Sequence, residues 1–206
     1  MRANWKRQWN NPERTVERNG IYFQTRIGDV QLVMLDTRSC RVNEARGEKH
    51  SFLGAEQSAW LQKVLTETTA PYVLISGGTM WTDQISAGKD SWGTWDHEGR
   101  EEVFTWIDAL QESGKKVLLF SGDRHGTHGF QVDRPNGYKI TELGVGTMGG
   151  VPGGGKAADP SQQLFKYQGF GTWAYAELEF TPQEDTPTII FRLINCDGSV
   201  MESFTF

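Results

Sequence analysis

The chain has 206 residues, of which 37% are hydrophobic, 12% aromatic and 23% charged. This length and apolar content suit a packed core, so we expect one domain over residues 1–206, or one large piece of a bigger domain. The net charge is −5 and no block of Lys or Arg is longer than a pair such as Lys115-Lys116, so binding along a nucleic-acid backbone is not expected. No apolar run approaches the roughly 20 residues of a membrane span, and residues 1–20 lack the apolar stretch of a signal peptide.

The first half of the chain alternates between strand and helix patterns. The expected elements, in chain order, are strands at 20–27 and 30–35, a helix at 55–67, a strand at 71–76, a helix from 96 to about 113, and a strand at 117–120. Asp96 is suited to cap the second helix. This order predicts an α/β fold with parallel neighbouring strands.

The second half reads as antiparallel β structure, because strand patterns follow one another without helices. The expected strands are 128–133, 138–145, 173–180, 187–194 and 199–206. Between them, residues 144–149 match GxGxxG and residues 150–156 match GxxxxGK. Both patterns require a helix directly afterwards to bind phosphate, and the prolines and glycines here oppose one. We therefore expect a glycine-rich loop over 144–155.

One polar stretch, SGDRHG (121–126), follows the buried strand at 117–120. Functional groups in α/β sheets collect beyond the carboxyl ends of strands, and Asp and His donors on a glycine loop suit a metal ion. We expect Asp123 and His125 to ligate a metal, with His128 and Asp36 as further candidates. The alternatives are a polar turn whose histidines cap backbone groups, and an Asp36 carboxylate that pairs with a nearby arginine.

Three tryptophans, Trp81, Trp92 and Trp95, fall in the segment between the strand at 71–76 and the next helix. They either pack over the core or form a surface that stacks on sugars or bases. The second reading gives the alternative function, a non-catalytic binding module with a tryptophan-rich ligand loop. Cys40 and Cys196 lie far apart in the sequence, and whether they form a disulfide stays open.

Several segments together resemble the C-terminal half of alkaline-phosphatase-D-like (PhoD-like) metallophosphatases of the calcineurin-like metallophosphoesterase superfamily. The segments are LDTRSCR (35–41), LGAEQSAWL (53–61), DSWGTWDHEGREEVFTWI (90–107) and SGDRHG (121–126). The later TELGVGTMGG and QGFGTWAYAELEF resemble the strand, loop and closing segment that follow in that family.

This resemblance implies an α-β-β-α fold of two sheets flanked by helices, and hydrolysis of phosphomonoesters or phosphodiesters at a two-metal centre that uses calcium, iron, manganese or zinc. The GDxH motif of the family falls on Asp123 and His125, which implies metal-site roles for both. Arg124 or Arg38 would stabilise charge on the phosphoryl oxygens of the substrate. Asp36 and Arg38 match a DTR motif that lies on the structural or substrate side.

The family carries its first metal ligands in an N-terminal half, for which this chain has no match. Three explanations stay open: a truncated gene product, a split protein that needs a second chain, and a degenerate homologue that no longer catalyses. Each predicts that this chain alone does not complete a two-metal site. If the upstream sheet is missing, exposed strand faces predict self-association. Members of the family are often exported, and this sequence leaves the localisation open.

Overall fold

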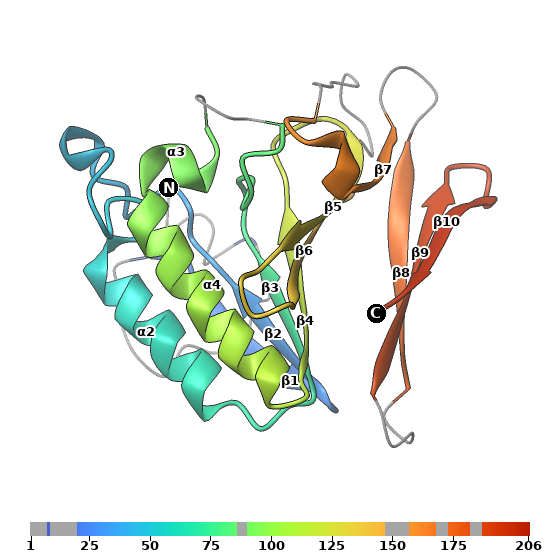
Figure 1. The fold of residues 1–206 in the computed structure, drawn as a ribbon, viewed down its shortest axis with the longest axis horizontal. Coiled ribbons are helices and arrows are strands. Elements are labelled where there is room, and N and C mark those ends of the chain that lie inside the picture. The colour runs from blue at the N-terminus through green and yellow to red at the C-terminus, as the bar shows by residue number, and fades with distance from the viewer. Residues whose placement is uncertain (1–7, 9–19, 86–89, 147–156, 168–172, 182–186) are drawn as a thin grey trace.

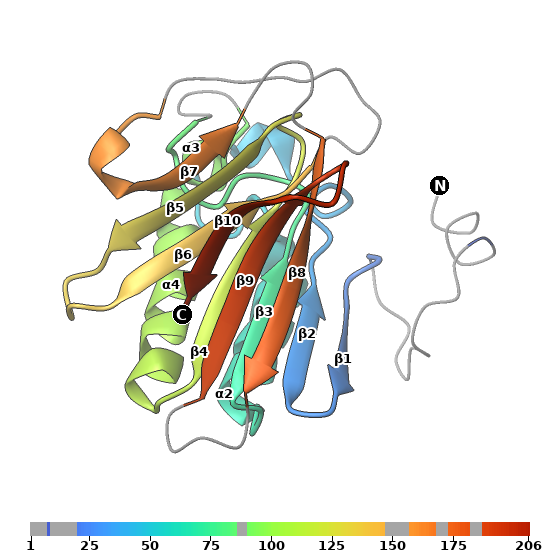
Figure 2. The same ribbon diagram turned by 90° about the vertical axis from the view of Figure 1, so that its right-hand side faces the viewer.

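A computed structural model describes residues 8, 20–85, 90–146, 157–167, 173–181 and 187–206 of the chain. The described elements form three layers, with two long helices on one face of a seven-stranded sheet and a three-stranded sheet against the other face (Figures 1 and 2). The expectation of an α/β fold is therefore confirmed. The glycine-rich segment 147–156 and most of the polar segment 1–20 lie outside the described residues.

The elements follow the hydrophobic pattern of the sequence closely. In chain order they are β1 (Phe23–Ile27), β2 (Val30–Met34), η1 (Asn43–Ala45), α2 (Gly54–Glu67), β3 (Tyr72–Ser76), α3 (Trp92–Trp95), α4 (His97–Glu112), β4 (Lys116–Ser121), β5 (Thr127–Asp133), β6 (Lys139–Gly144), η2 (Pro160–Gln162), β7 (Gln163–Tyr167), β8 (Ala174–Thr181), β9 (Thr188–Asn195) and β10 (Val200–Thr205). Each expected strand and helix is present, while α3, β7 and the two short 3-10 turns were not expected.

The strand order of the larger sheet is β1-β2-β3-β4-β6-β5-β7. Strands β2, β3, β4 and β6 run parallel, which confirms the parallel neighbours expected for the first half. The second half is not a separate antiparallel unit, because β6 pairs parallel with β4 while β5 lies outside it and pairs antiparallel with β6 and β7. Strands β8, β9 and β10 form the antiparallel smaller sheet.

The core between the helices and the larger sheet contains the three tryptophans of the 77–96 segment. Trp81, Trp92 and Trp95 are 1%, 3% and 9% exposed, and the Trp92 ring stacks on Phe52 with ring centroids 4.9 Å apart. Side chains this deeply buried offer no surface to a sugar or a base. The expectation of a tryptophan-rich ligand loop is therefore wrong, and the packing alternative is correct, because apolar contact with α2 and α4 outweighs exposure.

A second core lies between the two sheets. Phe165 of β7 stacks with Phe191 of β9 and Phe204 of β10 at centroid distances of 5.6 and 5.7 Å. Burial of these rings holds the smaller sheet against the larger one. Both cysteines are free thiols, so the question of a Cys40–Cys196 disulfide is answered. Within the described residues, no helix has the length and apolar character needed to cross a membrane.

Candidate functional site

The parallel strands β2, β3, β4 and β6 all end at one edge of the larger sheet, near α3 (Figure 1). The SGDRHG stretch occupies this edge, because β4 ends at Ser121 and β5 begins at Thr127. Two non-glycine residues of the intervening loop adopt the left-handed conformation, Asp123 with φ 72° and His125 with φ 47°. Such a conformation is uncommon for residues other than glycine, although Asp and His adopt it more often than most, and it occurs in turns and at functional sites.

The left-handed residues expose their side chains, while the arginine between them turns inward. Asp123 and His125 are exposed, whereas Arg124 is half-buried and its Nη2 donates to the Ile85 carbonyl at 3.4 Å. A carboxylate, an imidazole and a guanidinium therefore occupy three consecutive positions at the sheet edge. This set offers oxygen and nitrogen donors to a cation and a planar cationic group to an oxyanion.

Arg38 reaches this loop from the end of β2. Its Nη2 lies 2.8 Å from Asp90 Oδ2 and 4.0 Å from Asp123 Oδ1, and its side chain is 59% exposed. Asp90 also accepts from Arg41 Nη1 at 2.7 Å. Burial would raise the pKa of Asp90, but hydrogen bonds and charge from Arg41 and Arg38 outweigh burial and lower it. The ionised Asp90 thus holds the Arg38 guanidinium beside Asp123.

Arg41 holds the Asp90 carboxylate in place. Its side chain is 6% exposed, and its guanidinium carbon lies 4.4 Å from the centre of the Phe52 ring and 4.7 Å from that of the Trp95 ring. Its Nη2 donates to Thr79 at 3.0 Å. Because aromatic faces and a buried hydroxyl fix Arg41, the Asp90 carboxylate that it binds is also fixed.

The Asp36 carboxylate is turned toward the backbone rather than toward the loop. It is 3% exposed and accepts from the backbone N–H groups of Ile21, Arg38 and Ser39 at 2.8–3.1 Å. Burial would raise the pKa of Asp36, but these hydrogen bonds lower it, so the group is ionised. Asp36 caps the turn after β2 and thereby orients Arg38. This contact set differs from both readings of the sequence, in which Asp36 either ligates a metal or pairs with a nearby arginine.

His128 lies on β5, where the strand register explains its environment. Ser121 of β4 and His128 both pair with Gly144 of β6, so the three residues form one row across the sheet. A side chain at position 144 would overlap the imidazole, so only glycine leaves room for it. Across this gap His128 Nε2 lies 3.3 Å from Ser121 Oγ. Gly144, the first glycine of the GxGxxG pattern, therefore serves packing.

Burial also controls the chemistry of His128. The side chain is 2% exposed, and desolvation together with the positive charge of Arg124 lowers its pKa to about 4. The imidazole is consequently neutral at physiological pH. The structure thus separates His128, which is buried below the loop, from Asp123 and His125, which are exposed on it.

Glu142 is a buried carboxylate that the sequence analysis did not single out. It is fully buried on β6 and accepts from the Trp81 and Thr82 backbone N–H groups at 3.0 and 2.8 Å, and from Thr82 Oγ1 at 2.6 Å. Burial raises its pKa, opposed by hydrogen bonds from Thr82 and Ser121. The contacts connect the segment after β3 with the end of β4. The available signal was a charged residue within the strand expected at 138–145.

The donors at this edge do not add up to a closed metal site. Among the described residues, no three His, Cys, Asp or Glu side chains gather closely enough to hold a metal ion. Asp123 and His125 are two donors on one exposed loop, whereas catalytic metal sites use about three or more protein ligands. The described part of the chain therefore fits, at most, one side of a metal centre.

The described structure is a layered α/β fold that carries a loop of donors and arginines at the ends of its parallel strands. A family model described as PhoD-like phosphatase matches residues 6–173, and the chain belongs to that family. No curated protein was found to match the chain.

Two of the solved structures that match the chain share its fold. The structure of PhoD superposes with a TM-score of 0.56 and 18% sequence identity, covering 90% of this chain and 44% of that one. GAP50, described as the anchor in the inner membrane complex of Plasmodium, superposes with a TM-score of 0.54 and 12% identity, covering 90% of this chain and 53% of the other. The chain thus spans about half the length of the structures it matches.

Proposed function

We propose that this protein takes part in the metal-dependent hydrolysis of phosphomonoesters or phosphodiesters, with the 121–126 loop as one side of the active site. Membership of the PhoD-like phosphatase family supports phosphoesterase function in general. The observation that carries the assignment of the loop is its geometry. Asp123 and His125 are held in the left-handed conformation and exposed at the sheet edge, with Arg38 4.0 Å from Asp123.

In this proposal the residues of the chain have separate tasks. Arg38 and Arg124 bind phosphoryl oxygens, for which planar guanidinium groups are suited. Asp123 and His125 are the residues assigned to contact the metal. His128 and Asp36, the other two candidates, are buried and stabilise the loop and its surroundings. Stabilisation of charge on the phosphoryl oxygens by fixed cationic groups is worth most when those groups are held in place beforehand, and Asp90 does this for Arg38.

PhoD-like phosphatases are in general metalloenzymes, but the donor set described above is incomplete. Calcium, iron, manganese and zinc are the metals that the family resemblance suggests. Any further ligands come from outside the described residues, from another segment or from a second chain. We therefore assign no reaction step to a metal here, and we do not expect this chain to be a fully autonomous catalyst.

The test measures hydrolysis of bis-p-nitrophenyl phosphate by the purified chain, without metal and with manganese, iron or calcium. Where a metal stimulates turnover, that turnover should fall to background in His125→Ala and persist in His97→Ala, because His97 is an exposed histidine at the start of α4. Turnover that persists in His125→Ala contradicts the assignment. If no metal gives turnover, the missing ligands lie elsewhere, and a manganese titration then tests the loop: His125→Ala must weaken binding and His97→Ala must not.

A further inference from the structure

A cavity lies at the opposite end of β4 from the SGDRHG loop, where the strand begins. Its volume is about 300 Å³, which is the lower end of the range for small-molecule sites. Its lining includes three lysines, Lys115, Lys116 and Lys139, and no aspartate or glutamate. In a chain with a net charge of −5, such a lining does not follow from composition.

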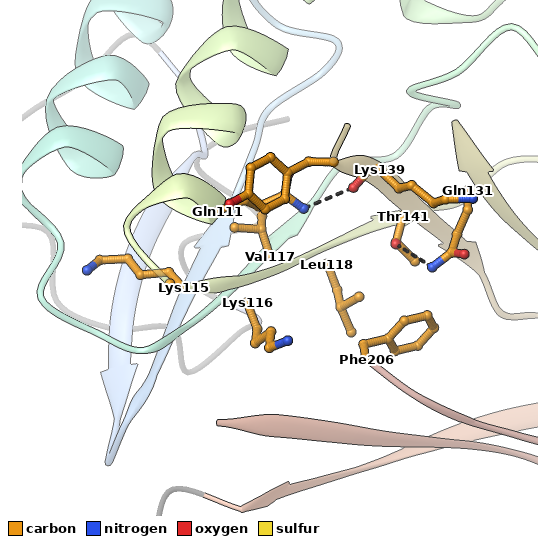
Figure 3. Close-up of a pocket in the computed structure, with 11 residues that line it drawn as sticks. Gln111, Lys115, Lys116, Val117, Leu118, Gln131, Lys139, Thr141 and Phe206 are labelled. Carbon is orange, nitrogen blue, oxygen red and sulfur yellow. Dashed lines mark hydrogen bonds between the residues drawn. The ribbon is translucent and has the colours of Figure 1, made fainter. Parts of the chain in front are cut away.

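Strand alternation explains why these side chains converge. Side chains two residues apart in a strand share a face, so Lys116 and Leu118 of β4 point to the same side of the larger sheet. The register pairs Gln131 with Thr141, and Lys139 lies two residues before Thr141 on β6. All five side chains are therefore on the face that the smaller sheet covers, and Phe206 closes the cavity from that sheet (Figure 3).

Hydrogen bonds fix the rim of the cavity. Gln111 Nε2 donates to the Lys139 carbonyl at 2.9 Å, and Gln131 Nε2 lies 3.3 Å from Thr141 Oγ1 (Figure 3). Two groups that a ligand would meet are thus held in place before binding, which lowers the entropic cost of binding.

The lysines of the cavity have little competing negative charge. Among the described residues, Lys116 has no carboxylate within ion-pair distance. Lys139 lies 3.2 Å from Asp133, whose side chain is 71% exposed. A pair this exposed is worth little in water, so a bound anion can replace it. Figure 3 shows Lys116 directed toward the space between Leu118 and Phe206, while Lys115 points away from it.

We propose that this cavity binds a small organic anion, with a phosphate or carboxylate group between Lys116 and Lys139 and an apolar body against Leu118 and Phe206. The two lysines supply charge-assisted hydrogen bonds to the oxyanion. The apolar wall provides the reason for an organic ligand rather than a free inorganic ion, because covering Leu118 and Phe206 removes apolar surface from water. The site is separate from the 121–126 loop, and it does not depend on hydrolysis there.

The test is a titration of the full chain with phenylphosphonate, followed by saturation-transfer NMR in the presence of EDTA. The P–C bond of this probe resists phosphoesterases, and EDTA removes any metal that could bind the phosphonate elsewhere. Lys116→Gln and Lys139→Gln should each weaken binding by about fivefold to tenfold, since each removes a charged donor. The matched control is Lys63→Gln, which removes the same charge from an exposed position on α2.

Further ligands test the roles of the charged group and of the apolar body separately. Benzyl alcohol, which lacks the charge, and inorganic phosphate, which lacks the apolar body, should both bind more weakly than phenylphosphonate. Benzoate shows whether the site accepts carboxylates as well as phosphoryl groups. The proposal is overturned if phenylphosphonate does not bind at about 10 mM, if both lysine variants bind as the wild type does, or if inorganic phosphate binds equally well. His125→Ala must leave binding unchanged, so failure of the hydrolytic function is distinguishable from failure of this site.

Discussion

His128 illustrates how position alone decides what a residue contributes. Its sequence neighbourhood is that of His125, three residues earlier, yet one imidazole is exposed and the other is 2% exposed. The difference arises because β5 begins at Thr127, so that residue 128 already belongs to a strand and faces Gly144. A buried neutral imidazole next to Ser121 stabilises the folded state only while it stays neutral.

Stability should therefore depend on pH through His128. Its pKa is about 4 in the folded chain against 6.5 when exposed, so the unfolded chain takes up the proton first as the pH falls. The contribution of the neutral imidazole is complete above about pH 6.5 and is lost toward pH 4, and a shift of this size corresponds to at most about 3 kcal/mol. Urea unfolding at about pH 7 and about pH 4 should show a larger loss for the wild type than for His128→Gln.

Glu142 acts in the opposite direction and provides an internal check. Its pKa is raised by burial, so its contribution to stability is greatest at low pH and is lost as the pH rises. Both proteins contain Glu142, and its effect therefore cancels in the comparison to the extent that the two sites are independent. An equal loss of stability in wild type and His128→Gln would mean that His128 does not titrate differently on folding.

The exposed part of the site was predictable from the sequence, whereas its supports were not. A glycine loop after an apolar strand identified Asp123, Arg124 and His125 as residues at the sheet edge. Asp90 and Glu142 escaped detection because their partners are distant in sequence: Asp90 binds Arg38 and Arg41, and Glu142 binds the segment at 81–82. Contacts at separations of about 50 to 60 residues depend on tertiary packing, which no local pattern encodes.

At the scale of an element, α4 shows a local signal that the structure confirms. Asp96 was expected to cap the helix, and its Oδ1 accepts from the Gly99 backbone N–H at 2.8 Å. Without this acceptor, one of the first N–H groups of the helix would be left unsatisfied in a buried place, because Asp96 is 1% exposed. The cap also fixes the start of α4 directly after α3, whose tryptophans pack the core.

Replacing this cap should destabilise the protein measurably. Asp96→Ala should lower the free energy of unfolding by about 1–2 kcal/mol, since it removes a cap whose N–H donor is buried. Asp96→Asn keeps an acceptor of the same shape and should cost clearly less. Denaturant unfolding of the two variants at one pH provides the measurement. If both variants lose the same free energy, the carboxylate charge is more important than the hydrogen bond to Gly99.

The place of β6 in the larger sheet could not be predicted from the sequence. The second half of the chain was expected to be antiparallel, and β5 and β6 do pair in this way. In the structure β6 lies between β4 and β5 and pairs parallel with β4. Glu142 and Gly144 acquire their roles only in that position. Strand β7 was not expected either, because the segment QLFKY is short and forms a strand through its pairing with β5.

For the whole molecule, the decisive feature is that the larger sheet carries a core on each face. One core joins it to α2 and α4, and the other joins it to β8, β9 and β10 (Figures 1 and 2). Among the described residues, the strands of the smaller sheet pair with one another, and none pairs with a strand of the larger sheet. Side-chain contacts therefore hold the smaller sheet in place, chiefly the packing of Phe165, Phe191 and Phe204, together with a hydrogen bond from Tyr167 Oη of β7 to Glu202 Oε1 of β10 at 2.5 Å.

The two layers that flank the larger sheet rest on separate cores, so a substitution in one core should lower the local stability chiefly of the layer that this core holds. Phe191→Ala removes a fully buried ring from the inter-sheet core and should cost about 3–5 kcal/mol. Native-state hydrogen exchange followed by mass spectrometry should then show faster exchange in β8, β9 and β10, with α2 and α4 little changed. Phe104→Ala, a ring of the helical core that is 2% exposed, is the matched control and should accelerate exchange in the helices instead. If both variants accelerate exchange equally in every layer, the two cores unfold as one cooperative unit, and the smaller sheet is not an independently opening layer.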